Sequence, residues 1–361
     1  MIQNDYNIKD YKDQFACKSA DLKNALKLYY TGPLEEFSSP TKFYRMRAEF
    51  RIFHEKDSVY YAMTEQKTGH LYRVDQFLIG SKKINQLMPE LLHCINENQI
   101  LRQKLFCVEF LTSTNGEAVI TLIYHKRLDH MWSAKATSIQ TPLGACIIGR
   151  SRGQKLVLKR DYVSESFFVN DRVLRYRQTE SSFTQPNAEI NQKLLRWVNK
   201  TCVNTSGDLV ELYCGNCNFT VVLAPKFRNV LATEFSKLAV KSGQYNLIAN
   251  DIRNVTIVRM SSEEISQAFY GRRRFNRLSG VDLKTFMFNT ILVDPPRAGL
   301  DESTLGLVSQ FDRIIYISCN PATLVNNIRV LDQTHEVECA AVFDQFPWTE
   351  HLEVGTILRK R

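Results

Sequence analysis

The sequence predicts an α/β protein in which a doubly wound, mainly parallel sheet follows a first domain of mixed α+β structure. A chain of 361 residues exceeds the usual size of one domain. Near residue 187 the hydrophobic pattern also changes, from alternating strands to short β runs separated by polar and helical stretches. We therefore expect two domains, residues 1–180 and residues 181–361.

The composition is that of an ordinary globular protein, with 24% charged and 44% hydrophobic residues and no internal repeat or low-complexity tract. Disordered and fibrous classes are thereby excluded. The net charge of +9 favours a polyanionic partner, nucleic acid foremost, because binding to phosphates releases counterions. A charge that only keeps the protein soluble explains the same surplus equally well.

The cysteines and the start of the chain bear on its location. Nine scattered cysteines suit reduced thiols better than a disulfide framework. Residues 1–10 are polar and lack the apolar core of a leader, and no later segment reaches the roughly 18 consecutive apolar residues of a membrane span. We expect a cytoplasmic protein that does not contact a membrane.

The first domain is predicted to combine several strands with one helix. Residues 43–53 alternate, with apolar side chains on one face and a largely basic face opposite. Residues 105–113 and 117–126 are β-rich runs joined around Asn115-Gly116, a pair typical of hairpins. The spacing of apolar residues over 84–99 indicates a helix.

The second domain is predicted to begin with a helix over residues 187–201, for which Asn187 is the N-cap. Seven β runs follow, a number that suits a doubly wound sheet, at residues 209–215, 229–235, 246–251, 289–294, 314–318, 339–344 and 354–359.

Residues after the first three β runs suggest a cofactor that contains adenosine, because ligands of doubly wound sheets lie beyond the carboxyl ends of the strands. Gly215 allows close approach of the backbone, and Asn218 can donate and accept hydrogen bonds. Glu234 follows about 20 residues later, the spacing at which an acidic side chain meets ribose hydroxyls. Asn250 and Asp251 either face the adenine or cap a helix.

The later β runs bring reactive groups to the same edge. Asp294 ends the fourth run and is followed by two prolines, while Cys319 stands directly after the fifth. A single cysteine is more often a buried, inert side chain, but this position favours a chemical role. Glu353 stands directly before the last run, and it is a candidate base only if a reacting proton lies beside it.

Taken together, five ordered motifs resemble the RNA uracil-5-methyltransferase family, in particular its bacterial branch acting on transfer RNA. They are TQPN, ELYCGNCNFT, LVDPPRAGLD, YISCNPATL and WTEHLEVG, and segments of the first domain are similar as well. The resemblance implies a Rossmann-like, S-adenosylmethionine (SAM)-dependent methyltransferase domain behind an RNA-binding domain. It also implies that the T-loop uridine of tRNA is the substrate, with T-like loops of tmRNA as a further one.

The resemblance implies roles for particular residues. Cys319 is the nucleophile that adds to carbon 6 of uracil, and Glu353 is the base that removes the proton from carbon 5, so that Cys319 is released. SAM is held by Gln185, Tyr213, Asn218, Glu234 and Asp294, without a metal or an iron–sulfur cluster. The partner is the tRNA T-arm, and no obligate protein partner is evident.

The RNA contacts are predicted from the chemistry of a flipped base. Arg297 is a candidate donor to the uracil oxygen, and Phe106 and His125 are candidates to replace lost stacking, although core packing explains Phe106 equally well. Candidate phosphate contacts are Arg45, Arg47, Arg51, Arg272, Arg273 and Arg274.

Other functions stay open at this stage. Cys217 stands where the family commonly has glycine, and with Cys214 it forms a Cys-x-x-Cys pair that alone is a weak metal or redox signal. The resemblance extends to members that act on ribosomal RNA, although their cysteine cluster and extra N-terminal barrel are not visible. Amino-methyltransferases use a similar Asp-Pro-Pro motif without a cysteine nucleophile, and a non-catalytic RNA-binding or RNA-folding protein is a third alternative.

Overall fold

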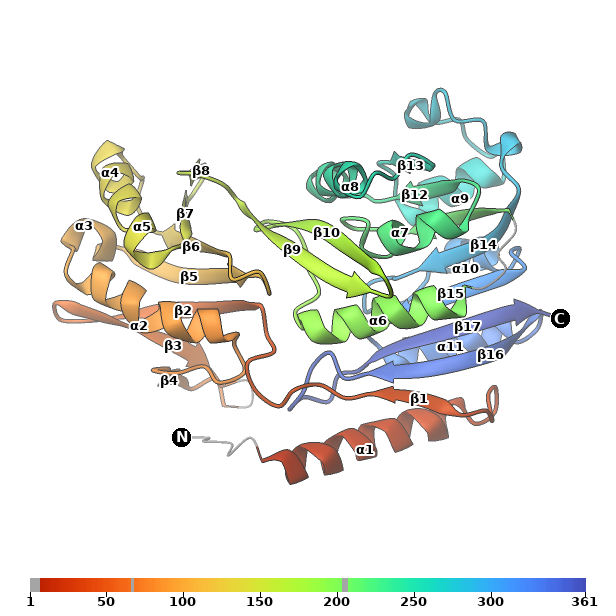
Figure 1. The fold of residues 1–361 in the computed structure, drawn as a ribbon, viewed down its shortest axis with the longest axis horizontal. Helices are drawn as coiled ribbons and strands as arrows, with labels where there is room; N and C mark the ends of the chain where they lie inside the picture. The colour runs from red at the N-terminus through yellow and green to blue at the C-terminus, as the bar shows by residue number, and fades with distance from the viewer. Residues whose placement is uncertain (1–6, 66–67, 203–206) are drawn as a thin grey trace.

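The computed structural model describes residues 7–65, 68–202 and 207–361. It contains two large sheets, each packed against helices, and a two-stranded β-hairpin that lies between the two sheets (Figure 1). Residues 1–6, part of the polar start considered above, lie outside the described residues. Within the described ranges, no helix is both long and apolar enough to cross a membrane.

The C-terminal sheet has eight strands in the order β1-β16-β17-β15-β14-β11-β12-β13. All neighbours are parallel except those of β17, which runs antiparallel to β15 and β16. The strands are β1 (Leu34–Phe37), β11 (Asp208–Leu212), β12 (Val230–Thr233), β13 (Val255–Val258), β14 (Phe288–Val293), β15 (Arg313–Ser318), β16 (His335–Phe343) and β17 (Glu353–Lys360). The fold class predicted from the sequence is confirmed.

Helices cover both faces of this sheet, because alternate strand residues point to opposite sides and both sides are apolar. One face packs against α6 (Ala188–Thr201), α7 (Asn218–Leu223) and α8 (Lys237–Ala249). The other packs against α1 (Ile8–Leu26), α9 (Ser262–Phe269), α10 (Glu302–Val308) and α11 (Pro321–Leu331). As predicted, the Asn187 side chain caps α6 by accepting the N–H of Ile190 at 3.2 Å.

The N-terminal sheet has the order β4-β3-β2-β5-β6-β7-β8, and its apolar face packs against short helices. Its strands are β2 (Arg47–Glu55), β3 (Ser58–Thr64), β4 (Leu71–Arg73), β5 (Leu105–Thr112), β6 (Ala118–Tyr124), β7 (Cys146–Ser151) and β8 (Gln154–Val157). The helices are α2 (Lys82–Asn96), α3 (Gln99–Arg102), α4 (His130–Ser138) and α5 (Gln140–Leu143). The predicted hairpin at Asn115-Gly116 joins β5 to β6, and the predicted helix is α2.

A separate hairpin of β9 (Tyr162–Val169) and β10 (Arg172–Thr179) lies between the two sheets (Figure 1). Its residues Phe167 and Tyr176 pack into the core around α6 and α7, while Val163 packs against the N-terminal sheet. The hairpin therefore contacts both parts of the molecule.

Two predictions about the elements were wrong. Residues 246–251 are not a strand: residues up to Ala249 end α8, Asn250 caps that helix, and the third parallel strand is β13, a few residues later. Residues 34–37 also do not belong with the first domain, because β1 pairs with β16 at the edge of the C-terminal sheet. The N-terminal sheet begins only at Arg47, so the expected unit of residues 1–180 needs correction at its start.

Candidate active site

A cavity of about 590 Å³ opens at the carboxyl ends of the parallel strands β11, β12, β14 and β15. This edge is where doubly wound sheets present their ligands. Its wall contains most of the residues singled out from the sequence, namely Gln185, Tyr213, Asn218, Glu234, Asp294, Arg297, Cys319 and Glu353. The structure thus brings these side chains together, although they come from distant parts of the chain.

Cys319 and Glu353 lie opposite one another at the ends of two antiparallel strands. β15 ends at Ser318, which pairs with Val354 of β17. Continuing this register by one residue sets Cys319 opposite Glu353. The Glu353 side chain is buried, and its Oε1 has no hydrogen-bond partner among the described residues. A buried, unpartnered carboxyl oxygen on the cavity wall is free to accept a proton from a bound ligand.

Burial dominates the electrostatics of the three carboxyl groups in and behind this cavity. It raises the pKa of Asp294 to about 7. The pKa of Glu353 lies well above its ordinary value, through burial first and then the charge of Asp294. Glu211 on β11 has a pKa of about 8 for the same first reason, although its Oε2 accepts the Thr220 hydroxyl at 2.6 Å. A cation bound in the cavity would favour the charged forms of Asp294 and Glu353, which line it.

The surroundings of Cys319 favour the protonated thiol over the thiolate. Burial raises the pKa of Cys319 to about 11, the charges of Glu353 and Asp294 add to the rise, and only Arg297 opposes it among the charged groups. Because the thiolate is the nucleophilic form, Cys319 is a poor nucleophile at neutral pH until a ligand changes its surroundings.

One side of the cavity is built around Gly215. This residue has φ +55°, and a side chain added there would meet no atom within 4 Å, so open space lies above the backbone. Glu234 orders the same turn, because its carboxylate accepts the N–H of Gly215 at 3.1 Å and that of Ser236 at 2.7 Å. The open backbone and the carboxylate fit a group with ribose hydroxyls.

Asn218 and Gln185 are oriented by neighbouring amides that sequence reasoning missed. Asn218 and Asn191 exchange hydrogen bonds of 2.9 and 3.1 Å between their side chains. The Oε1 of Gln185 accepts the side-chain N–H of Gln345 at 2.6 Å, and Phe346 lines the cavity beside it. Gln345 and Phe346 follow β16, so their place after a strand was the available signal.

The comparisons with known proteins agree with this arrangement. Residues 10–361 match the family described as tRNA (Uracil-5-)-methyltransferase. The chain belongs to this family. It is 50% identical over 354 residues to a tRNA/tmRNA (uracil-C(5))-methyltransferase of Teredinibacter turnerae, covering 97% of each chain. It is 51% identical over 360 residues to one of Neisseria meningitidis, covering 98% of each.

A solved structure supports the fold of this tRNA (uracil-5-)-methyltransferase family member. The tRNA (uracil-54, C5)-methyltransferase of Pyrococcus abyssi, in complex with S-adenosyl-L-homocysteine, aligns with a TM-score of 0.72 at 21% identity and covers 96% of this chain and 83% of its own. The predicted enzyme class, a SAM-dependent RNA methyltransferase, is confirmed by the family.

Cys217 stands in this family member where glycine is expected, and the structure shows how it fits. Cys217 has φ +66°, in the left-handed region that favours glycine, and it is the N-cap residue directly before α7. Gly243 of α8 provides the space, because a side chain there would approach the Cys217 Sγ to 2.7 Å. Within the described ranges, no three His, Cys, Asp or Glu side chains form a group that could hold a metal.

The predicted base-stacking residues lie on the N-terminal sheet, outside the cavity. The guanidinium carbon of Arg51 (β2) lies 4.7 Å from the ring centroid of Phe106 (β5). The ring centroids of Phe106 and His125 are 4.3 Å apart. Phe106 is half-buried and does not belong to the core cluster of this sheet. Arg51 and His125 are exposed, so the three side chains form a surface platform.

The remaining arginines divide into internal and exposed groups. Arg45 donates to the carbonyl of Arg47, and Arg47 donates to the carbonyls of Ser182, at 2.8 Å, and Glu180. Backbone oxygens therefore occupy guanidinium N–H groups of both side chains, which leaves fewer donors for contact with phosphate. Arg272, Arg273 and Arg274 are exposed in the segment after α9.

The raised pKa of Cys319 leads to a pH-dependent reactivity. In the protein without ligand, we expect the rate of Cys319 alkylation by iodoacetamide to rise about tenfold per pH unit from pH 7 to pH 9.5 without a plateau. A cysteine in a short unstructured peptide, whose thiol has a pKa of about 8.5, should level off in the same series. Peptide mass spectrometry measures the rate, and a Cys319 plateau below pH 9 would contradict the expectation.

Proposed function

We propose that this protein methylates carbon 5 of the T-loop uridine in tRNA, and of the corresponding loop in tmRNA, using SAM. The observation that carries the proposal is the placement of Cys319 and Glu353 opposite each other on the wall of a cavity that also holds all five predicted cofactor residues. The relatives at about 50% identity are named for tRNA and tmRNA. We further propose the cytoplasm as the location, since tRNA is the substrate.

The cofactor residues divide the work of holding SAM, which supplies the methyl group when bound. The Glu234 carboxylate suits the ribose hydroxyls, and the open backbone at Gly215 suits close contact. Asp294 provides a carboxyl group next to Cys319 whose charged form a cation favours. Gln185, Tyr213 and Asn218 complete the wall with hydrogen-bonding groups.

The covalent step begins with Cys319. Its thiol gives its proton to solvent water, and the thiolate forms an S–C bond to carbon 6 of uracil, while the electrons of the ring double bond move to carbon 5 and the adjacent carbonyl oxygen. The exposed Arg297 at the cavity wall supplies a donor for that oxygen. Carbon 5 thereby becomes nucleophilic enough to accept the methyl group.

Release of the product depends on Glu353. After methylation, carbon 5 carries both a methyl group and a proton. The Glu353 carboxylate takes this proton, the double bond between carbons 5 and 6 returns, and the S–C bond to Cys319 breaks. The raised pKa of Glu353 makes its carboxylate a stronger base than an exposed one.

The platform of Arg51, Phe106 and His125 suits an RNA loop whose target base has left its stack. Arg47 lies on the same face of β2 as Arg51 and bonds to Ser182, which lines the cavity. The two arginines are four positions apart on the strand, about 13 Å, so one loop can span the platform and the cavity mouth. We propose residues 181–361 with α1 and β1 as the catalytic unit.

A covalent trap tests the proposal. The protein is incubated with SAM and a T-arm RNA hairpin whose target uridine is 5-fluorouridine, because fluorine on carbon 5 blocks the final proton removal. We expect a slow-migrating band on a denaturing gel that depends on SAM and on the T-loop. A hairpin of ribosomal RNA sequence with the same substitution is the matched control.

The outcomes separate the alternatives. A band with the ribosomal hairpin alone would indicate that ribosomal RNA is the substrate. No band with either RNA, together with transfer of labelled methyl groups to an exocyclic amine, would favour the amino-methyltransferase. RNA binding without transfer or SAM binding would favour a non-catalytic protein.

A further inference from the structure

The segment of residues 344–352, the β16–β17 loop, leads directly into Glu353. It begins after Phe343 and ends at Leu352, and Phe343 pairs with Glu353 across the hairpin. Phe346 of this loop lines the cavity, and Gln345 donates a hydrogen bond to Gln185 of the cavity wall. The position of the proposed base therefore depends on how the two ends of the loop are held.

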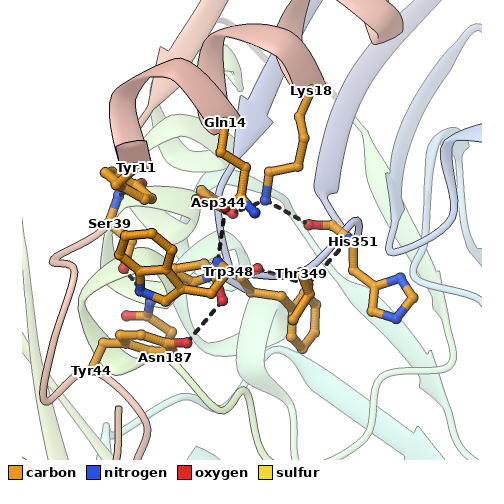
Figure 2. A network of polar contacts seen from close by, with 12 residues as sticks. Tyr11, Gln14, Lys18, Ser39, Tyr44, Asn187, Asp344, Trp348, Thr349 and His351 are labelled. Atoms are coloured by element: carbon orange, nitrogen blue, oxygen red, sulfur yellow. Dashed lines mark hydrogen bonds and ion pairs between the residues drawn. The ribbon is translucent and has the colours of Figure 1, made fainter. Parts of the chain in front are cut away.

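Lys18 of α1 holds both ends of this loop (Figure 2). Its Nζ lies 2.7 Å from Oδ1 of Asp344, the first loop residue, and donates to the carbonyl of His351 at 3.2 Å. The Lys18 side chain is 9% exposed and that of Asp344 is fully buried. One buried ammonium group thus connects the start of the loop to a residue two positions before Glu353.

The middle of the loop is held by the same part of the chain (Figure 2). Gln14 accepts the N–H of Trp348 at 2.9 Å, and the indole N–H of Trp348 donates to the carbonyl of Thr41 at 2.9 Å. The Tyr44 hydroxyl donates to the carbonyl of Pro347 at 3.0 Å. Trp348 itself has φ +67°, a conformation that needs such support.

The ion pair is not what attaches α1 to the protein. Tyr11, Phe15, Leu22 and Leu26 of α1 are buried in the core on that face of the sheet. Such apolar burial stabilises docking, whereas a buried ion pair can often be replaced without loss of stability. Docking of α1 therefore does not depend on Lys18. The contacts of Lys18 instead hold the β16–β17 loop in place.

We propose that Lys18 is a positioning residue that sets Glu353 for proton removal by fixing Asp344 and His351. The inference rests on the proposed function, because it needs Glu353 to be the base. Lys18 is not part of the cavity wall, and it acts only through the β16–β17 loop.

The test uses the full-length double variant Lys18→Met with Asp344→Asn. Removing both charges leaves no unpaired buried ion, and asparagine nearly keeps the size and shape of Asp344. We expect kcat on T-arm RNA to fall about 10- to 100-fold, with KM for SAM within about twofold. The covalent adduct with ordinary uridine should accumulate, while the rate of adduct formation with 5-fluorouridine RNA changes less than about threefold.

Lys23→Met, an exposed lysine on the same helix, is the control and should leave kcat unchanged. If the double variant does not fold, Gln14→Ala should show the same pattern to a smaller degree. An unchanged kcat, or an equal fall in adduct formation and turnover, would overturn the inference. If Glu353→Gln itself fails to accumulate adduct, the result contradicts the proposed role of Glu353 as the base, which is distinct from a failure of the Lys18 contacts.

Discussion

Cys319→Ala is expected to reduce methyl transfer to T-arm RNA by about 10⁴-fold or more. Without the thiolate, carbon 5 of uracil does not become nucleophilic, and the other cavity residues cannot replace a covalent bond. The half-buried thiol is small, so alanine should leave the fold and the cofactor wall intact. Transfer of the labelled methyl group from SAM to RNA measures the effect.

Two controls give that result its meaning. SAM binding, followed by calorimetry, should stay within about threefold of the wild type, and Cys17→Ala, an exposed cysteine on α1, should retain full activity. Methyl transfer by Cys319→Ala at more than a tenth of the wild-type rate would contradict a covalent mechanism.

Glu353→Gln is expected to trap the enzyme on its RNA. The adduct with ordinary uridine should form at nearly the wild-type rate, while turnover falls about 10²- to 10⁴-fold, because glutamine cannot take the proton from carbon 5. A denaturing gel and a turnover assay measure the two steps separately. Glu350→Gln, an exposed position in the same loop, is the matched control.

The same variant should alter stability with pH. Because the folded pKa of Glu353 is raised, the unfolded state ionises first as pH increases, and the native state loses stability above the ordinary carboxyl pKa. The melting temperature of Glu353→Gln should therefore exceed that of the wild type at pH 8, and the difference should shrink toward pH 5. A lower melting temperature at pH 8, or rapid release of the adduct, would contradict this account.

Strand ends made much of the cavity predictable. Asp294 and Cys319 each follow a strongly apolar run, and neighbouring parallel strands end at one edge, so their proximity follows from the pattern. Glu211 was missed even though it stands in a strand of five buried residues, where a carboxyl group is unusual.

Contacts between distant segments were not predictable. β1 is a four-residue edge strand with two glutamates, and nothing local distinguishes its partner β16 from other strands. Residues 246–251 contain too few apolar side chains for their pattern to distinguish a strand from the last turn of α8. The Lys18–Asp344 pair joins opposite ends of the chain, and each residue alone resembles an ordinary surface charge.

The pairing of β1 with β16 affects how the chain folds during synthesis. Their register joins Leu34 to Ala340, so β1 leaves the ribosome roughly 300 residues before its partner. At about 5 to 20 residues per second, that interval is about 15 to 60 s. The N-terminal sheet, formed by residues 47–157, can complete its pairing in that time, while α1 and β1 wait with their apolar residues unpacked. Their docking is then among the last steps, and a nascent-chain chaperone would find its binding site there.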